Sequence, residues 1–163
     1  MLEGGKSGVQ AGMDIIPGVV VICTLVMILT STGTVENGTV VYTGAAYEGV
    51  GLIPKIGAVL NPVLKPLFGF SSSECIAFPL TALGSVGAAL GLVPKLLEKN
   101  LITGNDIAVF TALGMCWSGY LSTHVGMMDT LNARKLAPKA ILSHTIGGIA
   151  AGISAHFLYL LLG

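Results

Sequence analysis

Long apolar stretches, separated by short polar ones, make up most of the chain. Residues 11–30 and 138–162 are each about as long as a helix must be to cross a hydrocarbon core, and they carry few charges. We predict a membrane-spanning helix in each. With the single cation Lys6 before it and small residues after it, the short apolar core of the first stretch also matches a signal peptide, so its removal from the mature protein is an alternative.

Two further apolar segments, 74–97 and 105–129, are interrupted. The first has no charged residue from Cys75 to Pro94, but Pro79 and several glycines weaken a straight helix there. The second has a polar stretch in its middle that begins at Trp117. Because lipid cannot satisfy free backbone groups, we predict two broken or re-entrant helices that neighbouring protein shields.

The region between the first span and the first broken segment has a different character. Asn37-Gly38 stands between residues that favour strands and is typical of a tight turn, which allows a small hairpin outside the bilayer. Residues 50–68 mix apolar side chains with lysines and prolines. This pattern favours an amphipathic helix at the membrane interface, with its lysines reaching the headgroups.

Composition places these elements in a membrane. Charged residues make up 10% of the chain, against about 25% in a soluble domain, and the mean hydropathy is +0.84. We therefore predict an all-α, multi-pass integral membrane protein of the cell (inner) membrane, with residues 1–163 as one domain. Zero net charge without a basic run argues against a nucleic-acid partner. No catalytic triad, phosphate loop or metal-binding pattern appears, so we expect no enzyme, metal or resident cofactor.

Candidate chemistry gathers at the two interruptions. A carboxylate at the edge of a broken membrane helix is costly unless it binds a ligand, a cation or a donor, and hydroxyls beside it suit a polar solute. Aromatic and hydroxyl groups at the second interruption suit a ligand with a flat ring and polar edges. The predicted substrate-binding residues are Ser71, Ser72, Ser73, Glu74, Trp117, Ser118, Ser122 and Thr123.

Three of the ionisable groups are candidates for coupling transport to an ion: Glu74, His124 and Asp129. Carboxylates with hydroxyl neighbours suit Na⁺, whereas an imidazole suits a proton, and the greater number of oxygen groups slightly favours Na⁺. The alternatives are a first-turn acid at the water interface for Glu74 and packed or solvated roles for the other two.

The last span has a regular row of small and polar residues. His144, Gly148, Gly152 and His156 follow one another at four-residue spacing and lie along one helix face. A GxxxG pattern allows close helix contact in membranes. We interpret this face as a packing surface on which the histidines form interhelical hydrogen bonds.

Several of these features together resemble a known family. The order comprises an amphipathic helix, Gly69-Phe70-Ser71-Ser72-Ser73-Glu74, a bend at Gly84-Ser85-Val86-Gly87, Leu101-Ile102-Thr103-Gly104-Asn105-Asp106, and the interrupted 117–129 region. It is similar to the nucleoside recognition ("Gate") domain family, in its short YjiG-like form related to spore maturation protein B. The similarity covers roughly residues 12–162 and is strongest over 69–139.

The resemblance implies half of a split transporter. Short members of the family occur beside a second membrane protein of the same broad family, and in concentrative nucleoside transporters a glutamate after small polar residues contacts the ligand. Ser73-Glu74 matches that position. We therefore expect a membrane subunit of a secondary transporter for a small polar solute, nucleoside-like or another small metabolite. Its expected partner is a second membrane subunit or, failing that, another copy of itself.

A different class of function accounts for the same glycine-rich pattern. Close helix packing alone would also serve a membrane scaffold, or a spore-maturation-type factor that acts through a partner membrane protein and moves no solute.

Overall fold

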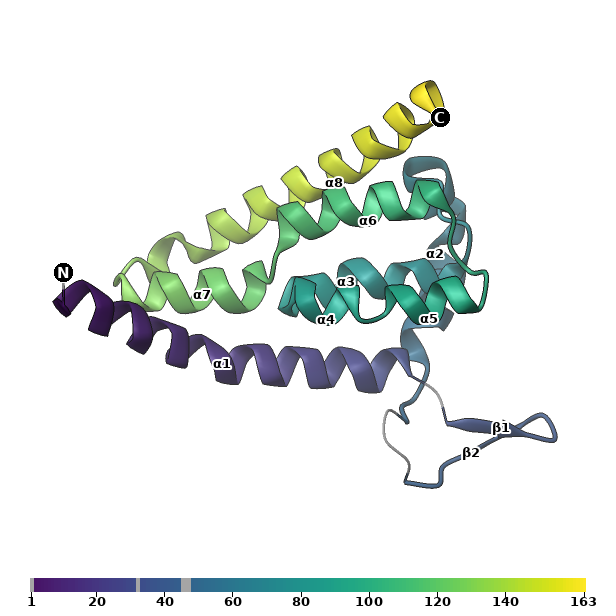
Figure 1. Ribbon diagram of the computed structural model, residues 1–163, viewed down its shortest axis with the longest axis horizontal. Helices are drawn as coiled ribbons and strands as arrows, with labels where there is room; N and C mark the ends of the chain where they lie inside the picture. The colour runs from purple at the N-terminus through teal and green to yellow at the C-terminus, as the bar shows by residue number, and fades with distance from the viewer. Residues whose placement is uncertain (1, 32, 45–47) are drawn as a thin grey trace.

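The computed structural model describes residues 2–31, 33–44 and 48–163. Within these residues the chain is mostly helical, and its long helices lie roughly side by side (Figure 1). The pair formed by α6 and α7 runs from one end of the molecule to the other, and α8 returns beside it in the opposite direction. The bounds of these helices are α1 Leu2–Thr30, α6 Gly104–Trp117, α7 Tyr120–Thr130 and α8 Ala137–Leu162. A short 3-10 turn, η2 (Arg134–Leu136), joins α7 to α8.

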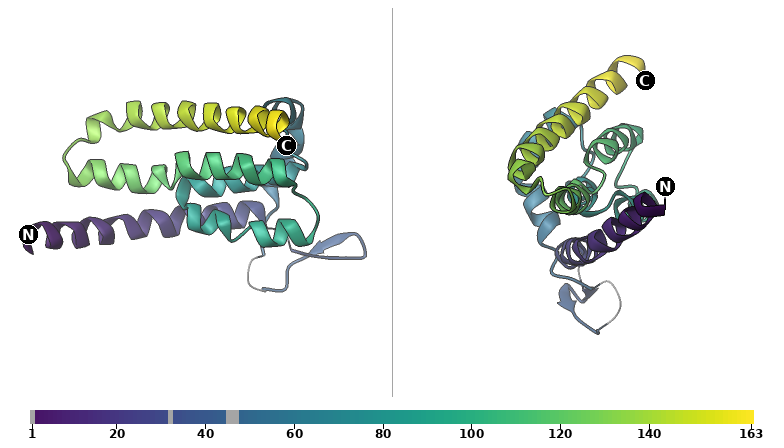
Figure 2. Two further views of the ribbon diagram at one scale, coloured as in Figure 1. Left: turned by 45° about the horizontal axis from the view of Figure 1, so that its top comes forward. Right: turned by 90° about the vertical axis from the view of Figure 1, so that its left-hand side faces the viewer.

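The segment predicted as the first broken helix folds into a re-entrant hairpin. It enters from the end of the molecule where α6 begins, turns back beside the break between α6 and α7, and returns to the same end (Figures 1 and 2). Its elements are η1 (Ser73–Ile76), α3 (Ala77–Gly84), α4 (Val86–Leu90) and α5 (Val93–Glu98).

Local chemistry explains where this hairpin bends. Pro79 lies in the first turn of α3, where no intrahelical partner for its missing N–H is needed, so the proline does not break the helix. The bend occurs instead at Ser85, whose extended backbone (φ −162°) ends α3. The Ser85 hydroxyl accepts a hydrogen bond from the Ala88 N–H at 3.3 Å and so caps α4.

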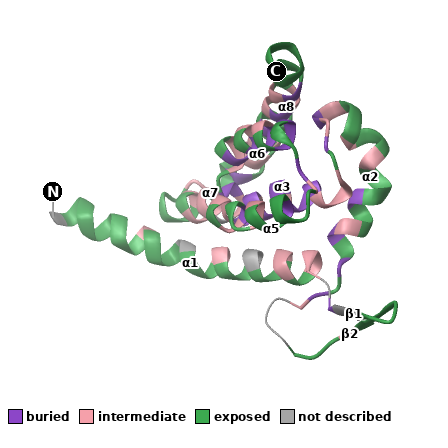
Figure 3. Ribbon diagram, turned by 45° about the vertical axis from the view of Figure 1, so that its right-hand side comes forward, coloured by how far each residue is buried: buried purple, intermediate pink, exposed green. Residues whose placement is uncertain are grey.

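The helix predicted over 50–68 corresponds to α2, Leu52–Phe68. Gly51 and Gly69 flank it with left-handed backbone conformations (φ 58° and 65°), which glycine adopts without steric cost. Gly57 lets α2 approach η1 closely, because a Cβ there would overlap the Ser73 carbonyl. The helix crosses the end of the molecule at which α3 and α6 begin, with much of its surface exposed (Figure 3).

The predicted tight turn is also confirmed. Strands β1 (Thr34–Glu36) and β2 (Thr39–Val41) pair antiparallel, with Glu36 opposite Thr39. Asn37 and Gly38 join them with φ values of 50° and 81°, and positive φ at both central residues is what a type I′ turn requires. The resulting hairpin stands clear of the helices (Figure 1).

The core lies between the re-entrant hairpin, α6 and α8. The rings of Phe78 and Phe110 stack with centroids 4.3 Å apart. On α8, a Cβ at Gly148 would overlap the Trp117 indole, and one at Gly152 would lie 3.0 Å from Leu113. The predicted close packing along the glycine row of α8 is therefore confirmed.

Two helices in the described part of the chain, α1 and α8, are long and apolar enough to cross a membrane by length and composition. None of the most apolar window of α1 is buried in this chain, and 17% of that of α8 is. The helix predicted to begin at residue 11 begins at Leu2, because residues 2–10 contain no proline to stop it. Two such helices are a weak indication of membrane association, because a signal sequence near the N-terminus, where α1 lies, has the same length and composition.

Candidate functional site at two helix breaks

The two interrupted segments meet. The backbone between α6 and α7 breaks at Ser118 and Gly119, and Gly119 has a left-handed conformation (φ 70°) that a side chain would disfavour. Its N–H donates to the Ala82 carbonyl in the last turn of α3 at 2.8 Å. This one hydrogen bond thus satisfies a backbone group at each break.

A cavity of about 290 Å³ lies next to this junction, between the re-entrant hairpin and α6. Phe78, Leu90 and Phe110 contribute to its mainly apolar lining. Two hydroxyl-bearing residues, Thr111 and Ser118, also line it. Of the residues predicted from the sequence to bind a solute, Ser118 lines this cavity.

On the other side of the break, aromatic side chains from the end of α6 and the start of α7 form hydrogen bonds with α8. The Trp117 indole N–H donates to the His144 carbonyl at 2.9 Å. The hydroxyl groups of Tyr120 and Thr145 share a hydrogen bond at 2.7 Å. Trp117 is therefore held by a specific bond inside the chain, beside the break where a ligand with a flat ring was predicted.

The predicted ion-coupling residue His124 also faces α8. Its ring lies against that of His144, with centroids 4.2 Å apart and planes tilted by 58°. Both histidines are half-buried. The sequence predicts an interhelical hydrogen bond from the His144 side chain; the described residues show an interhelical ring contact instead, with the His124 imidazole as its partner.

The Ser71 to Glu74 stretch lies at the other end of α3 from the break, about 12 Å away along the helix. Glu74 accepts a hydrogen bond from the Ser73 hydroxyl at 3.3 Å, and the Ser72 hydroxyl lies 3.5 Å from the Cys75 sulfur. The predicted binding residues Ser71 to Glu74 therefore lie at one end of the molecule. The predicted binding residues Trp117 and Ser118 lie at the junction.

Sequence reasoning missed the most buried carboxylate in this region, Asp106, whose side chain is fully buried. One of its oxygens accepts from the Ser71 hydroxyl at 2.6 Å, and from the N–H and hydroxyl of Thr103, each at 2.8 Å. The other accepts from the Ser71 N–H at 3.0 Å and the Cys75 thiol at 3.3 Å. Asp106 therefore caps α6 and fixes the loop that leads into the re-entrant hairpin.

The sequence contains a local signal for one part of this cluster, the bonds between Thr103 and Asp106. Thr103 and Asp106 form a capping box, with aspartate where glutamate is usual. The bonds to Ser71, which is 35 residues away in the sequence, have no local signal.

Beside Asp106, a second polar pair fixes α8. The Asn105 amide donates to the carbonyls of Phe68 and Gly69 at 2.9 and 3.0 Å. Its oxygen pairs with the His156 ring nitrogen Nδ1 at 2.7 Å. This confirms the prediction that His156 forms an interhelical hydrogen bond.

The matched serines of this loop provide a test of the Asp106 cluster. Ser71→Ala removes a bond to a buried charge and should lower the free energy of unfolding by about 1.5 to 3 kcal/mol. Ser72→Ala removes only the weak contact with Cys75 and should change it by less than about 0.5 kcal/mol. Thermal unfolding of both variants in detergent micelles measures the difference, and equal stabilities would contradict the cluster's role.

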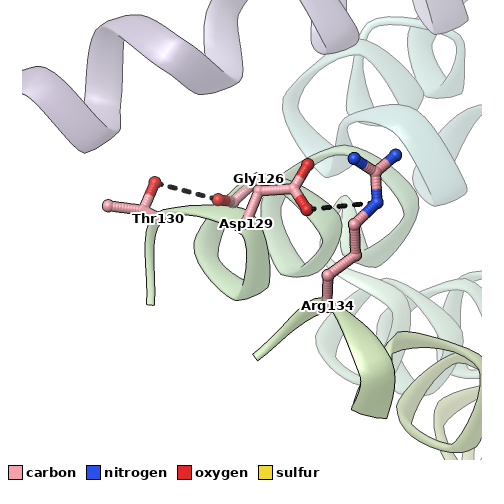
Figure 4. Close-up of polar contacts among 4 residues, drawn as sticks. All are labelled: Gly126, Asp129, Thr130 and Arg134. Atoms are coloured by element: carbon pink, nitrogen blue, oxygen red, sulfur yellow. Dashed lines mark hydrogen bonds and ion pairs between the residues drawn. The ribbon is translucent and has the colours of Figure 1, made fainter. Parts of the chain in front are cut away.

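The third predicted ion-coupling residue, Asp129, lies at the far end of α7. Its carboxylate pairs with the Arg134 guanidinium at 3.4 Å, and the two side chains are 42% and 79% exposed (Figure 4). The neighbouring Thr130 hydroxyl bonds the Gly126 carbonyl one turn back along the helix. Asp129 is thus part of an exposed ion pair, away from Glu74.

The remaining predicted residues lie near the break. Thr123 is half-buried, and its N–H donates to the Gly119 carbonyl at 2.7 Å. The Ser122 side chain lies outside the described part of the structure. The structure therefore gathers Trp117, Ser118, Thr123 and His124 around one junction and leaves Ser71 to Glu74 and Asp129 apart from it.

Comparisons with known proteins found no match to this chain among family models, curated proteins or solved structures.

Proposed function

We propose that this protein is a membrane subunit of a split secondary transporter for a small polar solute, nucleoside-like or another small metabolite. In this proposal α1, the α6–α7 pair and α8 cross the bilayer, α2 lies at its interface, and the re-entrant hairpin reaches the middle. The observation that carries the proposal is the hydrogen bond between Gly119 and Ala82, which joins two interrupted helices. Interrupted helices near the midplane are where many transporters bind substrate.

The surroundings of the junction support a ligand-binding role. It combines an apolar cavity with the Thr111 and Ser118 hydroxyls on one side and an aromatic group on the other. Few polar groups in a mainly apolar pocket are typical of small-molecule sites. Glu74, which lies about 12 Å away at the other end of α3, is not part of this junction site.

A second membrane subunit is part of this proposal. The apolar cavity opens at the molecular surface beside Leu90 and Met115, which are 58% and 80% exposed. Short helices such as α4 leave several backbone groups without intrahelical partners, and each such group in lipid costs several kcal/mol. A related membrane protein, or a second copy of this chain, would cover this side of the hairpin and complete the binding site.

Uptake by cells provides the test. A strain lacking the gene is assayed with radiolabelled nucleosides, bases and small organic ions, and then complemented with the wild type and with two glycine variants. Gly119→Ala forces a side chain into the left-handed region, at a cost of roughly 1 to 2 kcal/mol at the junction itself, and should reduce uptake measurably. Gly38→Ala imposes the same kind of strain (φ 81°) on the hairpin turn and should leave uptake unchanged.

The outcomes separate the two functional classes. Equal uptake by Gly119→Ala and wild type, at equal amounts in the membrane, would contradict a role for the junction in transport. If the deletion changes no uptake while the chain still copurifies with a second membrane protein, the scaffold function is correct instead.

A further inference from the structure

The contact between His124 and His144 is the most unusual arrangement of titratable groups near the junction. The rings belong to different helices, α7 and α8, and their centroids are 4.2 Å apart. Tyr120 also contacts the pair, with its ring stacked on that of His144 at a centroid distance of 5.6 Å and an interplanar angle of 21°. Both imidazoles are half-buried, which limits how well water can screen them.

Two imidazoles at this distance do not titrate independently. A proton on one ring repels a proton on the other, so the pair takes up its two protons in separate steps. Histidine is also the side chain whose charge changes between about pH 5 and 8. A pair of this kind can bind and release a single proton near neutral pH.

The other charged groups on the neighbouring elements have partners elsewhere or lie at the molecular ends. On α1, Asp14 is exposed and accepts a hydrogen bond from Gln10 at 2.8 Å. At the end of α7, Asp129 pairs with Arg134 of η2. The remaining charged or titratable groups on the described parts of α1, α2, α6, η2 and α8 are Glu3, Lys6, Lys55, Lys65, Asp106, Cys116, Lys135, Lys139, His156 and Tyr159, and α3 has none in its sequence.

We propose that His124 and His144 together form a site for one proton, and that this proton is the ion that couples to solute binding at the junction. The proton would come from water at the α7–α8 loop, where Leu131 and Asn132 are exposed. The coupling role rests on the proposed transport function, whereas proton binding by the pair does not.

Direct contacts connect the pair to the break. His144 accepts the Trp117 indole bond through its carbonyl and stacks on Tyr120 through its ring. Trp117 and Tyr120 immediately flank Ser118 and Gly119, the residues at which the helix is interrupted. A single proton on the pair adds one positive charge and one N–H donor to this contact, which would change how α7 packs on α8 and so change the position of the break relative to the re-entrant hairpin.

The test follows the three histidines individually. The full chain, labelled with ¹⁵N at histidine and held in detergent micelles, is titrated by NMR from pH 9 to pH 4. For wild type we expect the His124 and His144 signals to change together, in two steps separated by at least about one pH unit. In His144→Gln, His124 should titrate in a single step, whereas His156→Gln should leave the two steps of the pair unchanged.

Each result of the titration either supports or overturns the proton site. A single step at one common midpoint for both rings in wild type would overturn the proton site, and this measurement needs no variant to fold. Two steps that persist in His144→Gln would also overturn it. If the two steps are found but no solute is transported by wild type, the proton site stands and the transport function fails. If transport is found but does not depend on pH or on the pair, the coupling role fails while transport stands.

Discussion

Asp106→Ala is expected to lower the free energy of unfolding by about 3 to 5 kcal/mol, because it removes the acceptor for five donors around a fully buried carboxylate. The N–H groups of Ser71 and Thr103, whose bonds to Asp106 are partly buried, would lose their partners. Asp106→Asn should also destabilise, since either orientation of the amide turns its NH₂ toward groups that donate. Thermal unfolding in detergent micelles, followed by circular dichroism, measures both effects.

Asp14→Ala is the matched control for this prediction. It removes an exposed carboxylate that accepts one hydrogen bond from Gln10, so its effect should stay within about 0.5 kcal/mol. If Asp106→Ala were as stable as Asp14→Ala, the donors would have other acceptors and the cluster would not hold the loop onto α6.

Gly148→Ala is expected to disrupt the contact between α6 and α8, because its Cβ would overlap the Trp117 indole. Overpacking of this kind costs about 1 to 3 kcal/mol. Displacing the indole should also break its bond to the His144 carbonyl. Since the chain has a single tryptophan, its fluorescence spectrum reports the displacement directly, together with the loss of thermal stability.

The neighbouring residue provides the control. Gly147 lies on the same helix, and a Cβ there would have no atom within 4 Å. Gly147→Ala should therefore raise stability by up to about 1 kcal/mol through helix propensity and leave the fluorescence unchanged. Similar behaviour of the two alanine variants would show that α8 does not pack on Trp117 as described.

Local patterns in the sequence were sufficient to predict the individual elements. Asn37-Gly38 predicts the hairpin turn because both residues tolerate positive φ, and the mixture of apolar residues with lysines and prolines predicts α2. The interruptions near Ser85 and at Ser118–Gly119 follow from glycines and polar residues inside apolar runs. These features depend on residues close together in the chain.

Contacts between distant residues could not be predicted in this way. Asp106 reads locally as a helix cap, and only the fold brings Ser71 to it. His124 and His144 are on separate helices, and neither has a neighbour in the sequence that indicates the other. The same limit explains why the sequence analysis gives Glu74 and Trp117 as one set of binding residues, although α3 separates them.

In the proposed membrane arrangement, the 73–98 segment enters and leaves the bilayer on the same side. Its bend then meets the α6–α7 break inside the bilayer. Three exposed lysines allow matched substitutions: Lys65→Cys before the segment, Lys99→Cys after it, and Lys135→Cys in the α7–α8 connection. Labelling with a membrane-impermeant thiol reagent from each side of sealed vesicles, with wild type as the background, locates each position. We predict that residues 65 and 99 react from one side and residue 135 from the other, whereas reaction of 65 and 99 from opposite sides, or of all three from the same side, would contradict the account.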